Sequence, residues 1–164
     1  MTSLSEKTNE TATLSIRSGN TRVYVDQVTP TRDVKMQVAL GLPYPLHAGA
    51  SSKAFLAFLP DSEIELYLGG EHLDKLTKST VVDPRKLRRE LAAIRNVGYA
   101  SSFGERMEGA GAVAAPVFGR DGSPAGVISV CGPIERFRDT ADATAGLLLT
   151  HTRRASARLG HRNG

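Results

Sequence analysis

The chain has 164 residues, 40% of them hydrophobic, and a formal net charge of +4 from 21 basic and 17 acidic side chains. This size and apolar content suit one globular domain with its own core, and no linker-like change in composition divides the sequence. The single cysteine, Cys131, excludes an internal disulfide framework and a cysteine-based zinc cluster, and the polar first nine residues lack the apolar stretch of a signal peptide. We therefore expect one cytoplasmic domain over residues 1–164, without a membrane-spanning segment.

The first half of the chain predicts three strands and two helices. Residues 11–17 alternate apolar and polar side chains, residues 22–28 are β-branched and aromatic, and the Ser-Gly-Asn turn between them indicates a hairpin. Residues 33–38 alternate again and predict a third strand. A Pro-rich loop then leads into helices expected at residues 50–59 and 61–68, and a Gly-Gly pair ends the second helix.

The second half predicts one well-capped helix, three more strands and a closing helix. Asp83 suits the N-cap of the first helix, Pro84 its first position and Gly98 its end. The strands are expected at residues 99–103, 112–118 and 125–130, and the closing helix at residues 139–159. About six strands with helices grouped around them give an α+β fold built on an antiparallel sheet.

The junction between the Pro-rich loop and the helix at residue 50 is the most informative local feature. The loop approaches through rigid residues, and Gly49, Ala50 and Ser51 then begin an apolar helical pattern with small side chains. The first backbone N–H groups of a helix lack partners inside it and carry the positive end of its dipole. Small side chains would let a carboxylate approach these groups, although a tightly packed core helix without a ligand has the same pattern.

Other motifs give weaker signals. Residues 109–114 fit the loose dinucleotide pattern G-x-G-x-x-A, but a strand is expected after them where that motif requires a helix. Close packing of strands beside a cavity explains these small residues better. Ser51 and Ser52 lack the surroundings of a nucleophilic serine. The four histidines are scattered, and His47 is interpreted as structural, with a ligand role as the alternative. We expect no catalytic residue, metal or cofactor.

Two further patterns concern the last strand and the C-terminal helix. Ser129 and Cys131 are two residues apart on an expected strand, so their side chains share a face and could line a pocket together. The alternative use of Cys131 is as a small apolar core residue. Arg154, Arg158 and Arg162 recur every four residues, which is typical of a solvated helix end. No recognition motif or stacking aromatics accompany them, so nucleic-acid binding is disfavoured.

Several segments, taken in order, resemble those of one bacterial protein family. They are Tyr24-Val25-Asp26, Leu46-His47-Ala48 with Lys53-Ala54-Phe55-Leu56-Ala57, Ile94-Arg95 followed by Gly98-Tyr99-Ala100, Glu105 with Gly109, Val113 to Phe118, and Ile128 to Pro133. Over essentially its whole length the chain resembles the C-terminal effector-binding domain of IclR-type transcriptional regulators. The resemblance implies a GAF-like fold, an antiparallel sheet with helices on its faces, that senses a small molecule and is not an enzyme.

The resemblance also implies where a ligand binds. In such domains a small organic acid occupies a cavity between the sheet and the loop–helix segment, and its carboxylate meets backbone N–H groups at the positions of Ala50 and Ser51. The side chains implied around the ligand are those of Met36, Ser102, Ala112, Ser129 and Cys131. Ser102 stands where many members have Asp, and Ala112 where many have Cys or Ser, so the expected cavity is less polar.

The partners implied by the resemblance are an organic acid effector and further copies of the chain, in a dimer or tetramer. DNA would be bound only through a winged helix-turn-helix domain that is expected to be missing here, with residues 1–10 as the end of a linker helix. Two other functions stay open: a structural dimerisation module with a vestigial pocket, and a GAF-like reductase for oxidised methionine. The reductase needs several cysteines for thiol chemistry, and the lone Cys131 argues against it.

Overall fold

One six-stranded antiparallel sheet organises the chain in the computed structural model, which describes residues 1–70 and 73–162 and so leaves His72 outside. The strand order is β3-β2-β1-β6-β5-β4. The strands are β1 (Thr11–Ser18), β2 (Thr21–Val28), β3 (Pro43–Pro45), β4 (Ala100–Phe103), β5 (Ala110–Phe118) and β6 (Pro124–Pro133). The helices are α1 (Thr2–Thr8), α2 (Ala50–Leu56), α3 (Asp61–Leu68), α4 (Pro84–Val97) and α5 (Ile134–Arg158). The expected α+β fold class is confirmed.

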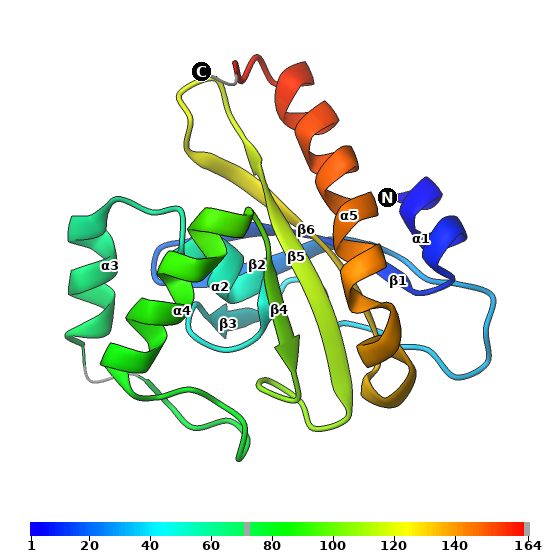
Figure 1. Cartoon of the computed structure of the whole chain (residues 1–164), viewed down its shortest axis with the longest axis horizontal. Coiled ribbons are helices and arrows are strands. Elements are labelled where there is room, and N and C mark those ends of the chain that lie inside the picture. The colour runs from blue at the N-terminus through cyan, green and yellow to red at the C-terminus, as the bar shows by residue number, and fades with distance from the viewer. Residues whose placement is uncertain (71–72, 163–164) are drawn as a thin grey trace.

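The helices form two groups on the two sides of the curled sheet. Helices α1 and α5 lie together on one side, and α2, α3 and α4 lie together on the other (Figure 1). Each group has its own apolar cluster against the sheet. Phe137 and Leu148 of α5 are fully buried with Val113 and Val130, and a second cluster joins α2, α3 and α4 to the opposite face. The sheet is therefore covered on both faces, as an α+β layer fold requires.

Two sequence predictions hold in detail. The hairpin forms between β1 and β2, which pair from Ala12 opposite Val28 to Ser18 opposite Thr21. In α4 the Asp83 carboxylate accepts a hydrogen bond from the Lys86 N–H at 2.7 Å. Gly98 ends the helix at a φ of 85°, a left-handed conformation that favours glycine. Local capping and turn chemistry therefore decide these boundaries.

The strand predicted at residues 33–38 is wrong, because this segment is irregular and the third strand, β3, comes later in the chain. Side chains of other segments hold residues 33–38 in place, where backbone pairing with a neighbouring strand was expected. The Gln27 amide donates to the Val38 carbonyl at 2.9 Å and accepts from the Val38 N–H at 3.0 Å. The Thr11 hydroxyl donates to the Met36 carbonyl at 2.5 Å. Alternating polarity does not distinguish this arrangement from a strand.

The helix predicted at residues 50–59 ends at Leu56, about one turn early. Arg95 of α4 explains the early end, because its guanidinium donates hydrogen bonds to the carbonyls of Ala57 and Leu59. In contrast, α5 begins at Ile134, five residues before the predicted start at residue 139, directly after Pro133. The loss of one turn leaves α2 with only seven residues.

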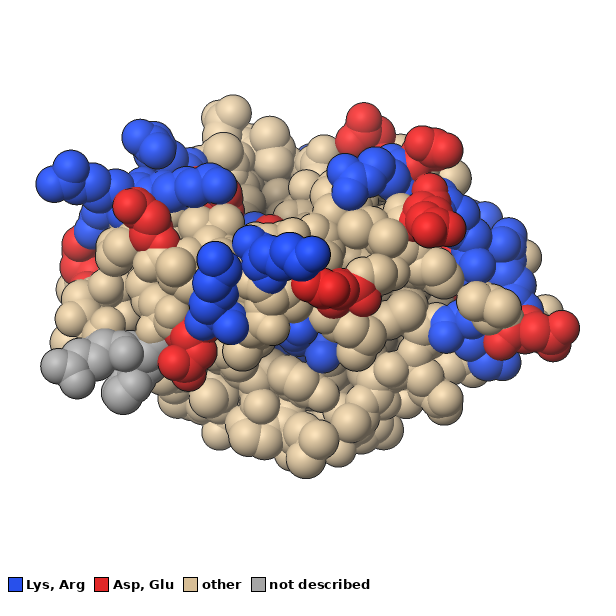
Figure 2. All heavy atoms as spheres, turned by 90° about the horizontal axis from the view of Figure 1, so that it is seen from below, with Lys and Arg blue, Asp and Glu red and all other residues tan. Residues whose placement is uncertain are grey.

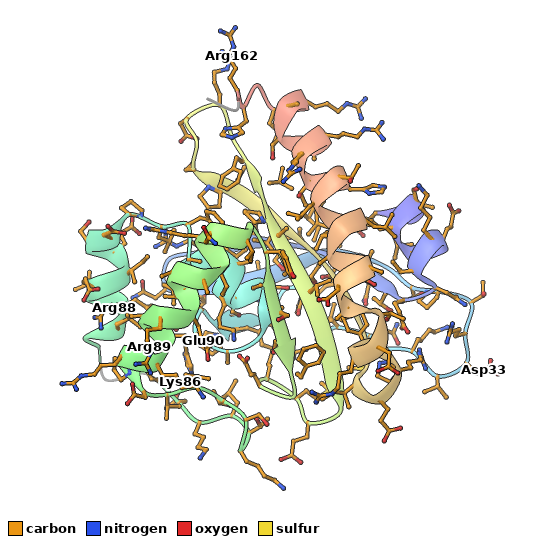
Figure 3. The ribbon with its side chains drawn as sticks, in the orientation of Figure 1. Asp33, Lys86, Arg88, Arg89, Glu90 and Arg162 are labelled. Atoms are coloured by element: carbon orange, nitrogen blue, oxygen red, sulfur yellow. The ribbon has the colours of Figure 1, made fainter. Side chains whose placement is uncertain are left out.

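The charged surface is mixed rather than basic. Figure 2 shows Lys and Arg at both ends and across the middle of one face, interspersed with Asp and Glu, with a broad uncharged area below them. Arg88 and Arg89 extend from α4, whereas Arg162 lies beyond the end of α5 at the far end of the molecule (Figure 3). The C-terminal arginines therefore form no continuous stripe along a helix. No helix in the described residues combines the length and apolar character needed to cross a bilayer.

Candidate functional site

A pocket lies between the start of α2 and the sheet, and we call it the α2 pocket. Six of the seven expected ligand contacts line it: Met36, Ala50, Ser51, Ser102, Ala112 and Cys131. They come from the irregular segment after β2, from α2, and from strands β4, β5 and β6. Ala112 is the β5 residue directly opposite both Ser102 and Cys131, so the sheet register brings these three together. Segments far apart in the sequence thus form one cavity wall.

Ser129 is the expected contact that the structure does not bring to the pocket lining. It shares the α2-facing side of β6 with Cys131, but it is 1% exposed and lies one pleat further along the strand. Its hydroxyl is 2.6 Å from the Thr13 hydroxyl of β1, directly across the ladder. Strand periodicity gives the shared face correctly but not how far along the strand the cavity extends.

The start of α2 is held by an ion pair at the pocket wall. Glu105 accepts a hydrogen bond from the Gly49 N–H at 3.2 Å and receives the Lys53 ammonium at 2.5 Å. Lys53 is 3% exposed and also reaches Glu90 of α4 at 3.2 Å. Gly49 has a φ of 89°, and a Cβ there would be 3.4 Å from Arg106. Only glycine fits this backbone without strain, so the sequence holds the Ala50 and Ser51 amides against the pocket.

Arg22 of β2 is the main functional feature that sequence reasoning missed. It lines the pocket at 1% exposure, and its guanidinium donates to the hydroxyls of Ser52 at 2.8 Å and Tyr24 at 3.1 Å. Burial lowers the pKa of Arg22, the neighbouring Tyr24 partly offsets this, and the Arg106 charge lowers the pKa further. The guanidinium therefore places a poorly solvated positive charge in the lining of the pocket.

Two tyrosine rings and a second arginine complete this end of the pocket. The Arg22 guanidinium carbon lies 4.2 Å from the centre of the Tyr24 ring, and that of Arg106 lies 4.8 Å from the centre of the Tyr44 ring. The two rings meet edge to face with centroids 5.5 Å apart. The negative faces of aromatic rings attract cations, so the tyrosines hold both guanidiniums in place.

Burial also sets the chemistry of Cys131. Desolvation raises the pKa of this thiol to about 12. A thiol with this pKa stays protonated at neutral pH, and the thiolate is the nucleophilic form. Cys131 therefore contributes a small, weakly polar wall, and the pocket offers hydrogen-bond donors and positive charge rather than an activated nucleophile.

His47 lies outside the pocket lining and is structural, as predicted. Its side chain is fully buried, with Nδ1 3.0 Å from the Tyr67 hydroxyl and Nε2 2.9 Å from the Asp74 carbonyl. The small residues at 109–114 also have a packing explanation, because a Cβ on Gly111 would be 3.0 Å from the ring of Phe137. Within residues 1–70 and 73–162, no group of three or more His, Cys, Asp or Glu side chains is placed to hold a metal ion.

The pocket is small. Its cavity volume is about 30 Å³, which leaves room for water but not for an organic acid. Four of its lining residues come from two irregular segments, with Met36 and Val38 on one and Arg106 and Met107 on the other. Met107 is 42% exposed, so the lining reaches the surface there. Unbranched methionine and arginine side chains can change rotamer, and entry of a ligand requires these to move.

The sequence contained one usable signal for Arg22. In β2 the buried positions are Arg22 and Tyr24, whereas Val25 is 41% exposed. The strand thus turns polar residues inward and an apolar one outward, the reverse of the usual alternation. An arginine on the inward face of a predicted strand, two residues before a tyrosine, is the pattern that would have indicated a buried charge.

Comparison with known proteins identifies relatives over most of the chain. The profile of a family described as bacterial transcriptional regulator IclR C-terminal matches residues 1–157. The HTH-type transcriptional regulator KipR of Bacillus subtilis is 34% identical over 85% of this chain and 56% of its own length. The transcriptional repressor IclR of Escherichia coli is 33% identical over 83% of this chain and 50% of its own length. The chain thus spans about half the length of these relatives.

Solved structures of related proteins have the same fold as this chain. The crystal structure of the Thermotoga maritima IclR superposes with a TM-score of 0.92 at 32% identity, over 98% of this chain and 65% of that one. An IclR homologue from Microbacterium hydrocarbonoxydans, solved in complex with 4-hydroxybenzoate, gives a TM-score of 0.86 at 22% identity, over 97% of this chain and 64% of that one. At that lower identity the likeness shows the fold alone.

Proposed function

Because the chain belongs to the IclR family of bacterial transcriptional regulators and matches its C-terminal domain, we propose that the α2 pocket binds a small organic acid as its effector. The carboxylate would meet the backbone amides of Ala50 and Ser51. Met36, Ser102, Ala112 and Cys131 would surround the rest of the ligand. Acid binding would favour one of two conformations and so change how the family's DNA-binding part engages DNA.

The observation that carries this proposal is a pocket with more cationic than anionic groups. Arg22 and Arg106 line the α2 pocket together with one acid, Glu105, whose charge Lys53 already compensates. The first amides of α2 add partial positive charge at the same wall. An anion is therefore the ligand class that the lining favours. The solved relative that binds 4-hydroxybenzoate supplies a first compound to try.

A binding screen with matched neutral compounds tests the proposal. Organic acids, beginning with 4-hydroxybenzoate and its neutral amide, would be compared by calorimetry and thermal unfolding. A ligand that binds only the folded protein at 100 times its dissociation constant adds about 2.7 kcal/mol of stability. We expect acids to bind and their amides to bind weakly or not at all. Binding of neutral or cationic compounds alone would show that the pocket is no anion site.

A pair of neighbouring serines provides the control for location. Ser102 lines the pocket, whereas Ser101, next to it on β4, is exposed. The substitution Ser102→Phe should fill the cavity and abolish acid binding, and Ser101→Phe should leave it unchanged. Unchanged binding in Ser102→Phe, with the protein folded, would place the acid elsewhere.

Self-association is the second part of the proposal. Ile16 of β1 is 41% exposed and lies directly opposite Val23 of β2, and Val25 on the same strand is also 41% exposed. These residues give the hairpin an apolar outer surface, which a second copy of the chain would bury. Sedimentation at about 100 µM should show a dimer or tetramer, and Ile16→Lys should weaken it. A strict monomer at that concentration would contradict this part without affecting acid binding.

A further inference from the structure

Arg22 has an unusual environment for a charged side chain in the described part of the chain. It is 1% exposed, and its hydrogen bonds all go to hydroxyl oxygens, those of Ser52, Tyr24 and, at 3.5 Å, Ser15. A guanidinium has five N–H donors, so two remain for another acceptor. Among the described residues no carboxylate lies within 4.0 Å of this guanidinium. Buried charges in proteins are normally paired with an opposite charge.

Arg106 repeats this situation next to Arg22. It is partly exposed, and its guanidinium carbon lies 4.8 Å and 5.9 Å from the centres of the same Tyr44 and Tyr24 rings that flank Arg22. No described carboxylate is within 4.0 Å of Arg106 either. Aromatic faces hold a cation in position but do not neutralise it. Two guanidiniums without an acid partner thus lie at one end of the pocket.

Glu105, the one acid among the described lining residues, is already engaged. Glu105 receives the Lys53 ammonium at 2.5 Å and the Gly49 N–H at 3.2 Å. An acid group of the ligand at the α2 start would lie beside Glu105 and would leave at least one guanidinium uncompensated. A ligand with a second acid group would satisfy the free N–H donors of Arg22, and charge-assisted bonds of this kind are about twice as strong as neutral ones.

We propose that the effector is a dicarboxylic acid, with one carboxylate at the start of α2 and the other bound by Arg22 and Arg106. This inference rests on the proposed function and narrows its ligand class. Arg22 then acts as the specificity-determining residue, because its buried charge penalises a neutral group at the same place. The chain length of the diacid that binds best would give the distance between the two carboxylate sites.

Matched pairs of ligands test the inference. Malonate, succinate, glutarate and adipate would each be compared by calorimetry with the corresponding monoamide, which has nearly the same shape but a single negative charge. We expect at least one diacid to bind about tenfold or more tightly than its monoamide, with affinity that falls as salt is raised. Equal binding within every pair, or binding of monocarboxylates alone, would overturn the inference and leave the proposed function intact.

Substitution of Arg22 supplies the second arm. In Arg22→Met the advantage of the diacid should disappear, while the affinity for the monoamide changes less than about twofold. Arg120→Met removes an exposed arginine and should change neither affinity. Thermal unfolding would check folding, and Arg106→Met, at a partly exposed position, would replace Arg22→Met if that variant did not fold. An equal loss for both ligands would mean that Arg22 binds the same carboxylate as α2, which contradicts two separate anchors.

A complete lack of acid binding is distinguishable from both results. If neither the diacids nor the monocarboxylates of the screen bind the unmodified chain, the proposed function fails, and this inference fails with it.

Discussion

The two faces of the same sheet both bury apolar side chains, but they differ in how many polar side chains they bury with them. On the α5 face, Val113 and Val130 pack against Phe137 and Leu148, all of them fully buried and apolar. On the α2 face, the buried positions around β1, β2 and β6 include polar side chains: Thr11, Thr13, Ser15, Arg22 and Ser129. Apolar burial stabilises the fold on both sides, and the α2 face also positions hydroxyls and a buried charge. Ligand selectivity is thus concentrated on one face of the sheet.

The largest effect should come from the apolar face. Replacing Phe137 by Ala leaves a cavity among Gly111, Val113 and Val130, and such changes typically cost about 3 to 5 kcal/mol of unfolding free energy. Leu159→Ala, at a position that is 51% exposed, should cost less than about 0.5 kcal/mol. Urea unfolding would measure both. A Phe137→Ala variant as stable as the parent would show that the apolar cluster on this face contributes little to stability.

Breaking the buried ion pair at α2 should have the next largest effect. Lys53→Met leaves the Glu105 carboxylate, only 11% exposed, without its cation, and loss of one partner of a buried pair costs about 3 kcal/mol. The double variant Lys53→Met/Glu105→Gln also removes the unpaired carboxylate charge, and it should recover most of the lost unfolding free energy. The comparison of single and double variants by urea unfolding measures the coupling, and additive losses would show that the pair contributes nothing.

Ser129→Ala should have a smaller effect. The change removes the hydrogen bond with the Thr13 hydroxyl, worth about 0.5 to 1.5 kcal/mol, and leaves that hydroxyl without a partner. Because Ser129 does not line the α2 pocket, we expect the loss in unfolding free energy and little change in acid affinity. A tenfold loss of affinity with unchanged stability would reverse this and support the role in ligand contact that family resemblance implies.

The smallest effect on stability should come from Arg22. In Arg22→Met a buried cation with no acid partner among the described residues is exchanged for an apolar side chain of similar length, and removal of the buried charge offsets the loss of its hydrogen bonds to Ser52 and Tyr24. We expect the free energy of unfolding to change by less than about 1 kcal/mol in the absence of ligand, as measured by urea unfolding. A loss of 3 kcal/mol or more would mean that Arg22 belongs to the structural core, and the contrast between the two faces would fail there.

Much of the fold follows from local patterns in the sequence. The Asp83 cap, the Gly98 terminator and the hairpin at residues 18–20 depend on a few neighbouring residues, so their positions can be predicted. The end of α2 cannot, because it depends on Arg95 from a helix almost forty residues later. Residues 33–38 mislead for a similar reason, since their partners are side chains of other segments.

The candidate site likewise has features that the sequence indicates and features that depend on the assembled fold. Resemblance to a family indicated part of the pocket lining, including Met36 and Ala112, but not its charge. Arg22 and Arg106 acquire their roles only when the sheet register and the turn before β5 place them at the same tyrosines. Burial of a charge is a property of the assembled fold, and a linear pattern shows it only where the usual alternation is reversed, as it is in β2.

The attachment of Val38 through the Gln27 side chain has a consequence for how such a domain evolves. Met36 and Val38 of the segment at residues 29–42 line the pocket, yet around Val38 the segment is held to β2 by a side-chain amide rather than by a strand ladder. Insertions, deletions and substitutions in this segment leave the pairing of β1, β2 and β6 untouched. Lineages that descend from one such domain can therefore diversify this part of the pocket lining, and with it the compounds they respond to, without rebuilding the scaffold.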